Sequence, residues 1–144
     1  MSSLSKKRRR RSAAIAAAAA LAAAFALGIG VSGTIRSHSD PLASVLAKPG
    51  AKLVTMPGHG VVAVAPDQSA AVALTLPRAP AGKTYEAWVI RKGKARPAGL
   101  FTASAVFKLQ RSVPRGSVIA VTLEPAGGVD QPTTKPLTAS EAIS

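Results

Sequence analysis

The side chains that could form a hydrolytic site are few and scattered along the chain. Ser69, His59 and Asp67 are the three residue types of an acyl-transfer triad. All three lie in segments rich in turn-forming residues. No G-x-S-x-G sequence accompanies Ser69 to hold its hydroxyl on a sharp strand-to-helix turn. We therefore expect loop residues here and no catalytic triad.

A second candidate for catalysis is the carboxylate pair Glu86 and Glu124, because glycoside hydrolysis uses two acidic side chains. Each lies inside a short apolar, β-branched run typical of a strand. Carboxylates in such positions more often make cross-strand or turn hydrogen bonds. We expect a structural role for both residues and predict that the chain is not an enzyme.

The composition excludes several other kinds of site. The chain has no cysteine and two histidines among its 144 residues. Disulfides, zinc–thiolate sites, Cys nucleophiles and a His-rich metal cage are therefore excluded. The sequence contains no phosphate-binding loop and no dinucleotide fingerprint. We expect no cofactor, no metal and no small-molecule substrate.

Charge and hydropathy divide the chain sharply near its N-terminus. The net charge is +13, and an unbroken basic block supplies much of it. That block consists of Lys6, Lys7, Arg8, Arg9, Arg10 and Arg11. Residues 13–35 follow without a charge. As a helix, this run would be about 35 Å long, enough to cross a hydrocarbon core of about 30 Å. The pattern predicts one transmembrane helix over residues 13–35.

The basic block also sets the predicted orientation, because Lys and Arg remain on the cytoplasmic side. Residues 1–12 are then a cytoplasmic stub and the chain beyond residue 35 is extracytoplasmic. A cleaved signal peptide is the alternative, with the same consequence for the rest of the chain. The apolar run exceeds the usual length of about 7–15 residues for a signal peptide, which favours a membrane anchor.

Six adjacent cations can also bind nucleic acid phosphates. Residues 6–11 have no interleaved aromatic side chain that would contact bases. A role in topology and in attraction to anionic lipid explains them better. We therefore predict a lipid bilayer as a partner and no nucleic acid.

Beyond the apolar run, residues 36–52 contain Pro41, Pro49 and Gly50 and indicate a juxtamembrane linker, with one short helical turn near residues 42–46. From residue 53 to 144, short β-branched runs alternate with Pro and Gly. This texture predicts an all-β domain, a small antiparallel β-sandwich. The predicted strands are 60–65, 71–76, 83–90, 105–109 and 117–124.

Two features of the predicted strands bear on packing and binding. Tyr85, Ala87 and Val89 alternate with Glu86, Trp88 and Ile90, as in a central strand with two covered faces. The following turn carries Arg91, Lys92, Lys94 and Arg96. Such a tip is commonly solvated. It also suits contact with anionic lipid or cell-wall polymers, so these four residues form a candidate interaction tip.

Two stretches carry a resemblance to a known family. They are Leu76–Phe101 (LPRAPAGKTYEAWVIRKGKARPAGLF) and Ala120–Leu137 (AVTLEPAGGVDQPTTKPL). Their order and spacing resemble the C-terminal, extracytoplasmic domain of the anti-sigma-K factor (RskA) family. The motif residues, for which we expect structural roles, are Gly82, Tyr85, Trp88, Gly99, Leu100, Phe101, Glu124, Pro125, Gly127 and Gly128.

The resemblance implies a function by protein interaction. In that family, one transmembrane helix joins the extracytoplasmic domain to a cytoplasmic domain that holds a sigma factor inactive. Here residues 1–12 contain no sigma-binding helices. We therefore expect a non-catalytic membrane protein that regulates sigma-factor activity by protein interaction, either as the product of a split or truncated gene or as a stand-alone exported sensor module. An exported module that contacts anionic surface polymers, or has a structural role in the envelope, is the alternative.

Overall fold

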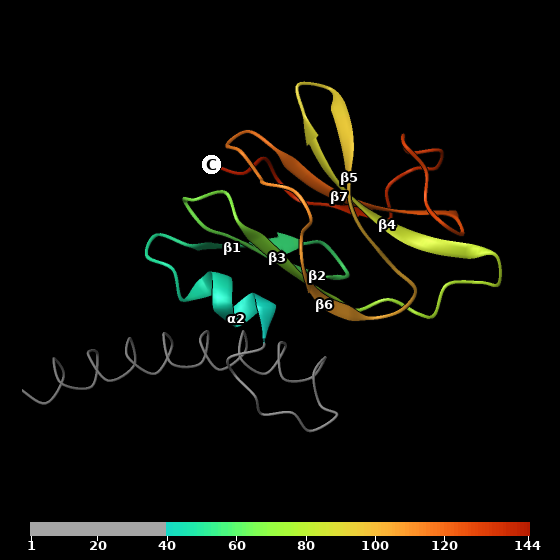
Figure 1. Cartoon of the computed structure of the whole chain (residues 1–144), viewed down its shortest axis with the longest axis horizontal. Coiled ribbons are helices and arrows are strands. Elements are labelled where there is room, and N and C mark those ends of the chain that lie inside the picture. The colour runs from blue at the N-terminus through green and yellow to red at the C-terminus, as the bar shows by residue number, and fades with distance from the viewer. Residues whose placement is uncertain (1–39) are drawn as a thin grey trace, which may run out of the picture.

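Two four-stranded antiparallel sheets and one short helix make up the folded part of the chain (Figure 1). The structure is a computed structural model that describes residues 40–144. Sheet A has the strand order β1-β2-β3-β6 and sheet B the order β5-β4-β7-β8. The elements are α2 (Pro41–Leu46), β1 (Lys52–Met56), β2 (Gly60–Val64), β3 (Ala70–Leu74), β4 (Lys83–Arg91), β5 (Lys94–Phe101), β6 (Ala105–Lys108), β7 (Val118–Pro125) and β8 (Thr138–Ala139).

The all-β fold class is confirmed, and each predicted strand corresponds to an observed one within a few residues. Three strands were not among those predicted: β1, β5 and the two-residue edge strand β8. β1 has a mixed pattern with little apolar alternation, and β5 contains Pro97, which normally argues against a strand. The predicted transmembrane helix and the basic block lie outside the described residues. No helix within residues 40–144 is long and apolar enough to cross a membrane.

The hydrophobic core lies between the two sheets and follows the alternation of the strands. Tyr85, Ala87 and Val89 point from β4 into this core, as their spacing predicts. Phe101 stacks between Tyr85 and Phe107, with ring centroids 5.3 Å and 5.2 Å apart. Sheet A contributes mainly valine and leucine, including Val62, Val72 and Leu74.

The outer face of sheet A is covered by α2, which lies where the sequence predicts a short helical turn near residues 42–46. Asp40 caps the helix by accepting a hydrogen bond from the Leu42 amide at 2.9 Å. Leu42 and Val45 pack on small alanine side chains of β2 and β3. Alanines leave room for a helix to approach the sheet closely. Residues 41–46 therefore pack against sheet A as part of the same folded unit.

Candidate functional site

The structure separates the residues of the candidate triad. Ser69 and Asp67 hydrogen-bond each other in the β2–β3 turn, where Lys48 Nζ also lies 2.7 Å from Asp67 Oδ2. The Lys48 hydrogen bond, aided by Ser69, holds the pKa of Asp67 well below its usual range. His59 lies at the other end of β2, so about 17 Å of strand separates it from Ser69. Its Nδ1 contacts the Thr75 carbonyl at 3.3 Å.

Glu124 is fully buried on the outer face of sheet B, where it fastens the loop of residues 126–137 to the sheet. Its Oε1 accepts hydrogen bonds from the Thr133 amide at 2.9 Å and from Thr122 Oγ1 at 2.7 Å. Its Oε2 accepts a hydrogen bond from Thr133 Oγ1. Burial acts to raise the pKa of Glu124, but the hydrogen bonds outweigh it and the pKa lies below its ordinary value.

Glu86 lies on the same outer face and fastens an earlier part of the same loop. Its Oε2 accepts one hydrogen bond, from the Val129 amide at 3.0 Å. Burial raises the pKa of Glu86; the Val129 bond opposes this, and the nearby charges of Glu124 and Asp130 add to the rise. The two carboxylates therefore differ in the number of hydrogen bonds that hold them, and both are engaged by the loop.

Trp88 completes this buried polar layer. Its side chain is fully buried, and its Nε1 donates to Thr122 Oγ1 at 2.8 Å. Thr122 in turn donates to Glu124. A chain of hydrogen bonds thus runs from Trp88 on β4 through Thr122 and Glu124 on β7 to Thr133 in the loop, and each of these side chains has a hydrogen-bond partner.

The glycines of the two family motifs lie at close contacts. Gly99 has φ +154°, and a Cβ there would lie 2.7 Å from the Phe107 ring. Gly128 has φ +78°, and a Cβ there would lie 2.9 Å from a Leu100 methyl group. Both values favour glycine.

Other motif residues make contacts within the first stretch and between the two stretches. Tyr85 Oη donates to the Pro77 carbonyl at 2.7 Å, and the Ala126 amide donates to the Gly82 carbonyl at 2.9 Å. Lys83 pairs with Pro125 at the start of the β4–β7 ladder. Gly127 lies exposed in the turn that follows. These contacts are all internal to the fold.

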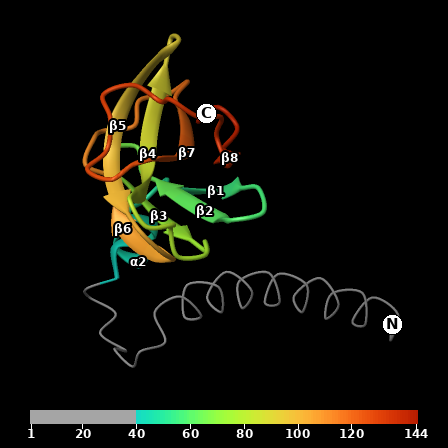
Figure 2. The same ribbon diagram turned by 90° about the vertical axis from the view of Figure 1, so that its right-hand side faces the viewer.

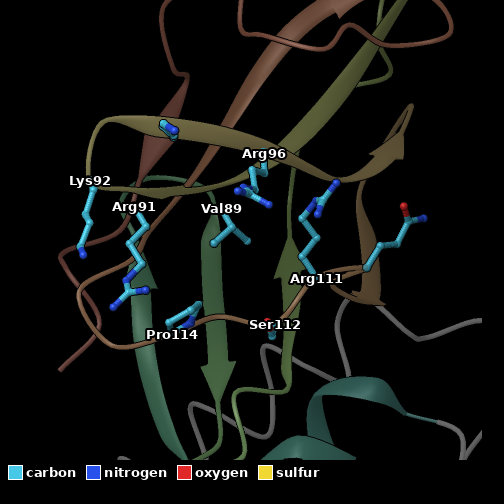
Figure 3. A pocket seen from close by; sticks show the side chains of 9 residues that line it. Val89, Arg91, Lys92, Arg96, Arg111, Ser112 and Pro114 are labelled. Atoms are coloured by element: carbon cyan, nitrogen blue, oxygen red, sulfur yellow. The ribbon is translucent and has the colours of Figure 1, made fainter.

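The predicted interaction tip forms one wall of a basic groove with a cavity volume of about 460 Å³ (Figure 3). The β4–β5 hairpin faces the segment of residues 110–114 across it. Side chains from both walls point into the space between them, Arg96 from the hairpin and Arg111 from the opposite segment. The groove is lined by Val89, Arg91, Lys92, Lys94, Arg96, Gln110, Arg111, Ser112 and Pro114.

A β-bulge in β5 brings Arg111 to this groove. Ala87 pairs with Gly99 but Trp88 pairs with Pro97, so Ala98 is an extra residue in the strand. The bulge turns two carbonyls toward the neighbouring segment. The Ala98 carbonyl accepts from the Gln110 amide at 2.9 Å, and the Pro97 carbonyl accepts from Arg111 Nε at 2.6 Å.

Arg111 is the groove residue that sequence reasoning missed. It lies 15 positions beyond Arg96, in a segment without periodicity. Pro97 within an apolar stretch is a signal for a bulge, but it does not indicate which distant segment the freed carbonyls bind.

Two comparisons with known proteins found a match to this chain. The family described as "Anti-sigma-K factor rskA, C-terminal" matches residues 14–137. An uncharacterized protein in the phr 5' region of Streptomyces griseus is 38% identical over 109 residues, which cover 69% of this chain and 46% of that protein. The chain thus spans about half the length of that relative. No solved structure matches this chain at a significant level.

The family match spans most of the sequence, and it includes every residue of both motifs that the fold brings together through Gly82 and Ala126. The chain therefore belongs to the family of the anti-sigma-K factor rskA C-terminal domain.

Proposed function

We propose that this chain is a single-pass membrane protein that regulates sigma-factor activity by protein interaction. Its span would be residues 13–35, with residues 1–12 in the cytoplasm and the two-sheet domain on the opposite side. The observation that carries the proposal is the family match over residues 14–137, which takes in both the apolar run and the folded domain.

The positions of the charged residues support an orientation with the N-terminus inside. Six consecutive cations precede the apolar run, and cationic residues flanking a span are retained in the cytoplasm.

Two features support a role without catalysis. The triad candidates lie at opposite ends of β2, and both buried carboxylates are hydrogen-bonded to the loop above them. A general acid or base must reach a substrate proton within hydrogen-bond distance. The family is one of regulatory anti-sigma factors, and its membership implies a sigma factor as partner.

The test is a deletion of the gene followed by complementation. We expect sigma-dependent transcripts to change after deletion and the full chain to restore them. Tagged full chain, cross-linked in cells, is expected to recover a sigma factor or a protein that binds one. Unchanged transcripts together with recovery of neither would overturn the proposal.

A matched variant separates regulation from catalysis. The double variant Ser69→Ala and His59→Ala removes the nucleophile and base candidates and changes only turn residues. We expect it to complement as well as the unaltered chain. Failure to complement, with normal protein levels, would point to an enzyme instead.

A further inference from the structure

The basic groove between the β4–β5 hairpin and residues 110–114 carries charge without compensation. Five of the chain's 19 Lys and Arg residues line it. All six Asp and Glu residues lie in the described part of the chain, and none of them lines the groove. The ion pair found within residues 40–144 joins Lys48 and Asp67, which are not groove residues.

The hairpin places like charges opposite each other, an arrangement that does not favour folding. Arg91 pairs directly with Lys94 across the strands, next to the pair of Val89 and Arg96. Like charges at such positions repel and destabilise a sheet. Positive φ angles at Lys92 (51°) and Gly93 (75°) form the tight two-residue turn that fixes this register.

The opposite wall is also fixed before any ligand arrives. Arg111 is held by its hydrogen bond to the Pro97 carbonyl, and the backbone beside it is held by the Gln110 bond to Ala98. The guanidinium uses Nε for this contact, which leaves its Nη groups available for an anion. A site held in place in this way loses less entropy on binding.

The chemistry of the lining selects the class of ligand. Five cations suit a ligand with several negative charges. Three of them are arginines, whose guanidinium groups bind phosphate through two parallel hydrogen bonds. Protein interfaces usually contain a large apolar or aromatic anchor at their centre. Within residues 40–144, the exposed large apolar residues are Leu46, Leu53, Leu100 and Leu137, and none lines the groove. The groove also has no aromatic side chain on which a nucleic acid base would stack.

The position of the groove favours a polymer over the bilayer. The hairpin tip and α2, where the folded part begins, lie at opposite ends of the domain in both views (Figures 1 and 2). If the chain is anchored through residues 13–35, the tip therefore points away from the membrane. This one step rests on the proposed function; the charge and geometry of the groove do not.

We propose that this groove binds a phosphodiester polymer without bases, of the poly(glycerol phosphate) kind. Arg91, Arg96 and Arg111 bind its phosphates, and Lys92 and Lys94 add longer-range attraction. The domain would thereby attach to, or sense, an anionic polymer on the same side of the membrane.

The absence of cysteine allows a probe placed inside the groove. Ser112→Cys, on the exposed rim, carries an environment-sensitive fluorophore on the full chain in nanodiscs of neutral lipid. Thr55→Cys, exposed on β1, carries the same label as a control. The local label reports the groove and is blind to polymer bound at residues 6–11.

With poly(glycerol phosphate), we expect a saturable change at position 112 and none at position 55. The triple variant Arg91→Gln, Arg96→Gln and Arg111→Gln is expected to weaken binding by about tenfold or more. Its log affinity should also depend on log salt less steeply, by about 2 in slope. The matched variant Lys52→Gln, Arg78→Gln and Lys108→Gln removes three cations outside the groove and is expected to bind normally.

Several results would overturn the proposal. They are no change at position 112, an equal loss in the matched variant, or tighter binding of single-stranded DNA, poly-glutamate or anionic vesicles than of poly(glycerol phosphate). Thermal unfolding of the triple variant checks that it folds. Polymer binding is measured on the purified chain, so it can be observed even if gene deletion leaves sigma-dependent transcripts unchanged. The two proposals can therefore fail independently of each other.

Discussion

Sheet B carries charged residues in two regions that differ in almost every respect. Near the loop of residues 126–137, Glu86 and Glu124 are buried and accept hydrogen bonds from that loop. At the hairpin tip, the cations are exposed, and no acidic side chain lines the groove that they form. The strand β4 runs through both regions.

The buried carboxylates stabilise the fold, whereas the exposed hairpin cations do not and are available to bind a ligand. A buried carboxylate is tolerated only if its oxygens are hydrogen-bonded, so each acceptor bond at Glu124 contributes to stability. Exposed cations add little to stability and here repel one another. Substitutions in the two regions should therefore affect different measurements.

The largest effect is expected at Glu124. Glu124→Ala removes three accepted hydrogen bonds and leaves the Thr133 amide and the Thr122 hydroxyl without their partner. We expect a loss of about 3 kcal/mol in the free energy of unfolding, measured by urea titration. Glu141→Ala, at an exposed carboxylate, is the control and should change it by less than about 0.5 kcal/mol. Equal losses in the two variants would contradict a special role of the buried layer.

Gly99→Ala should be next in size. The added methyl group meets the Phe107 ring at 2.7 Å, and overpacking costs about 1–3 kcal/mol. Gly58→Ala is the control, because it also has positive φ (+74°) but nothing within 4 Å of its Cβ. Adding Phe107→Leu to Gly99→Ala should restore part of the loss. No restoration would mean that backbone strain, not the ring, is the cause.

The third prediction concerns pH and distinguishes the two carboxylates. The raised pKa of Glu86 means that its protonated form favours folding. Its contribution is complete below the ordinary value of 4.5 and is lost as pH rises through the higher folded-state pKa. Glu124, with a lowered pKa, contributes above 4.5 and loses this as pH falls.

Urea unfolding from about pH 2.5 to about pH 8 measures both contributions, because the Glu124 contribution is lost below its ordinary pKa and the Glu86 contribution above it. Glu86→Gln should remove the component of stability that declines with rising pH, and Glu124→Gln should remove the component that declines toward acid. If both variants changed the profile in the same direction, the assignment of the two pKa shifts would be wrong.

The smallest effect on stability is expected in the groove. Arg91→Gln removes one of two like charges that face each other in the β4–β5 pair. The free energy of unfolding should stay within about 0.5 kcal/mol of the original or rise slightly. A clear loss in thermal and urea unfolding would show that these cations support the fold after all.

The sequence predicted most of the fold because short β-branched runs are separated by Pro and Gly, and because β4 alternates between two faces. The face assignment of Tyr85, Ala87 and Val89 follows from a period of two and is confirmed by the core. The edge elements were harder. A helical turn near residues 42–46 was predicted, and α2 lies there, but it is too short to show a helical period that would indicate its packing on the alanines of sheet A.

The sequence predicted one wall of the groove, the hairpin cations, but not the opposite wall. The hairpin cations are contiguous in sequence, so their clustering was evident. Arg111 joins them through a bulge whose carbonyls happen to bind a segment far along the chain, and this depends on tertiary packing. The role of Glu124 as a loop anchor likewise required knowledge of where Thr133 lies.

The central claim is that the folded domain displays this groove across a membrane from the basic block. Single-cysteine variants of this Cys-free chain test it directly: Ser3→Cys before the block and Lys92→Cys at the exposed hairpin tip. With a membrane-impermeant maleimide on spheroplasts, we predict labelling of Lys92→Cys in intact cells and of Ser3→Cys only after permeabilisation. Labelling of Lys92→Cys only after permeabilisation would contradict the account.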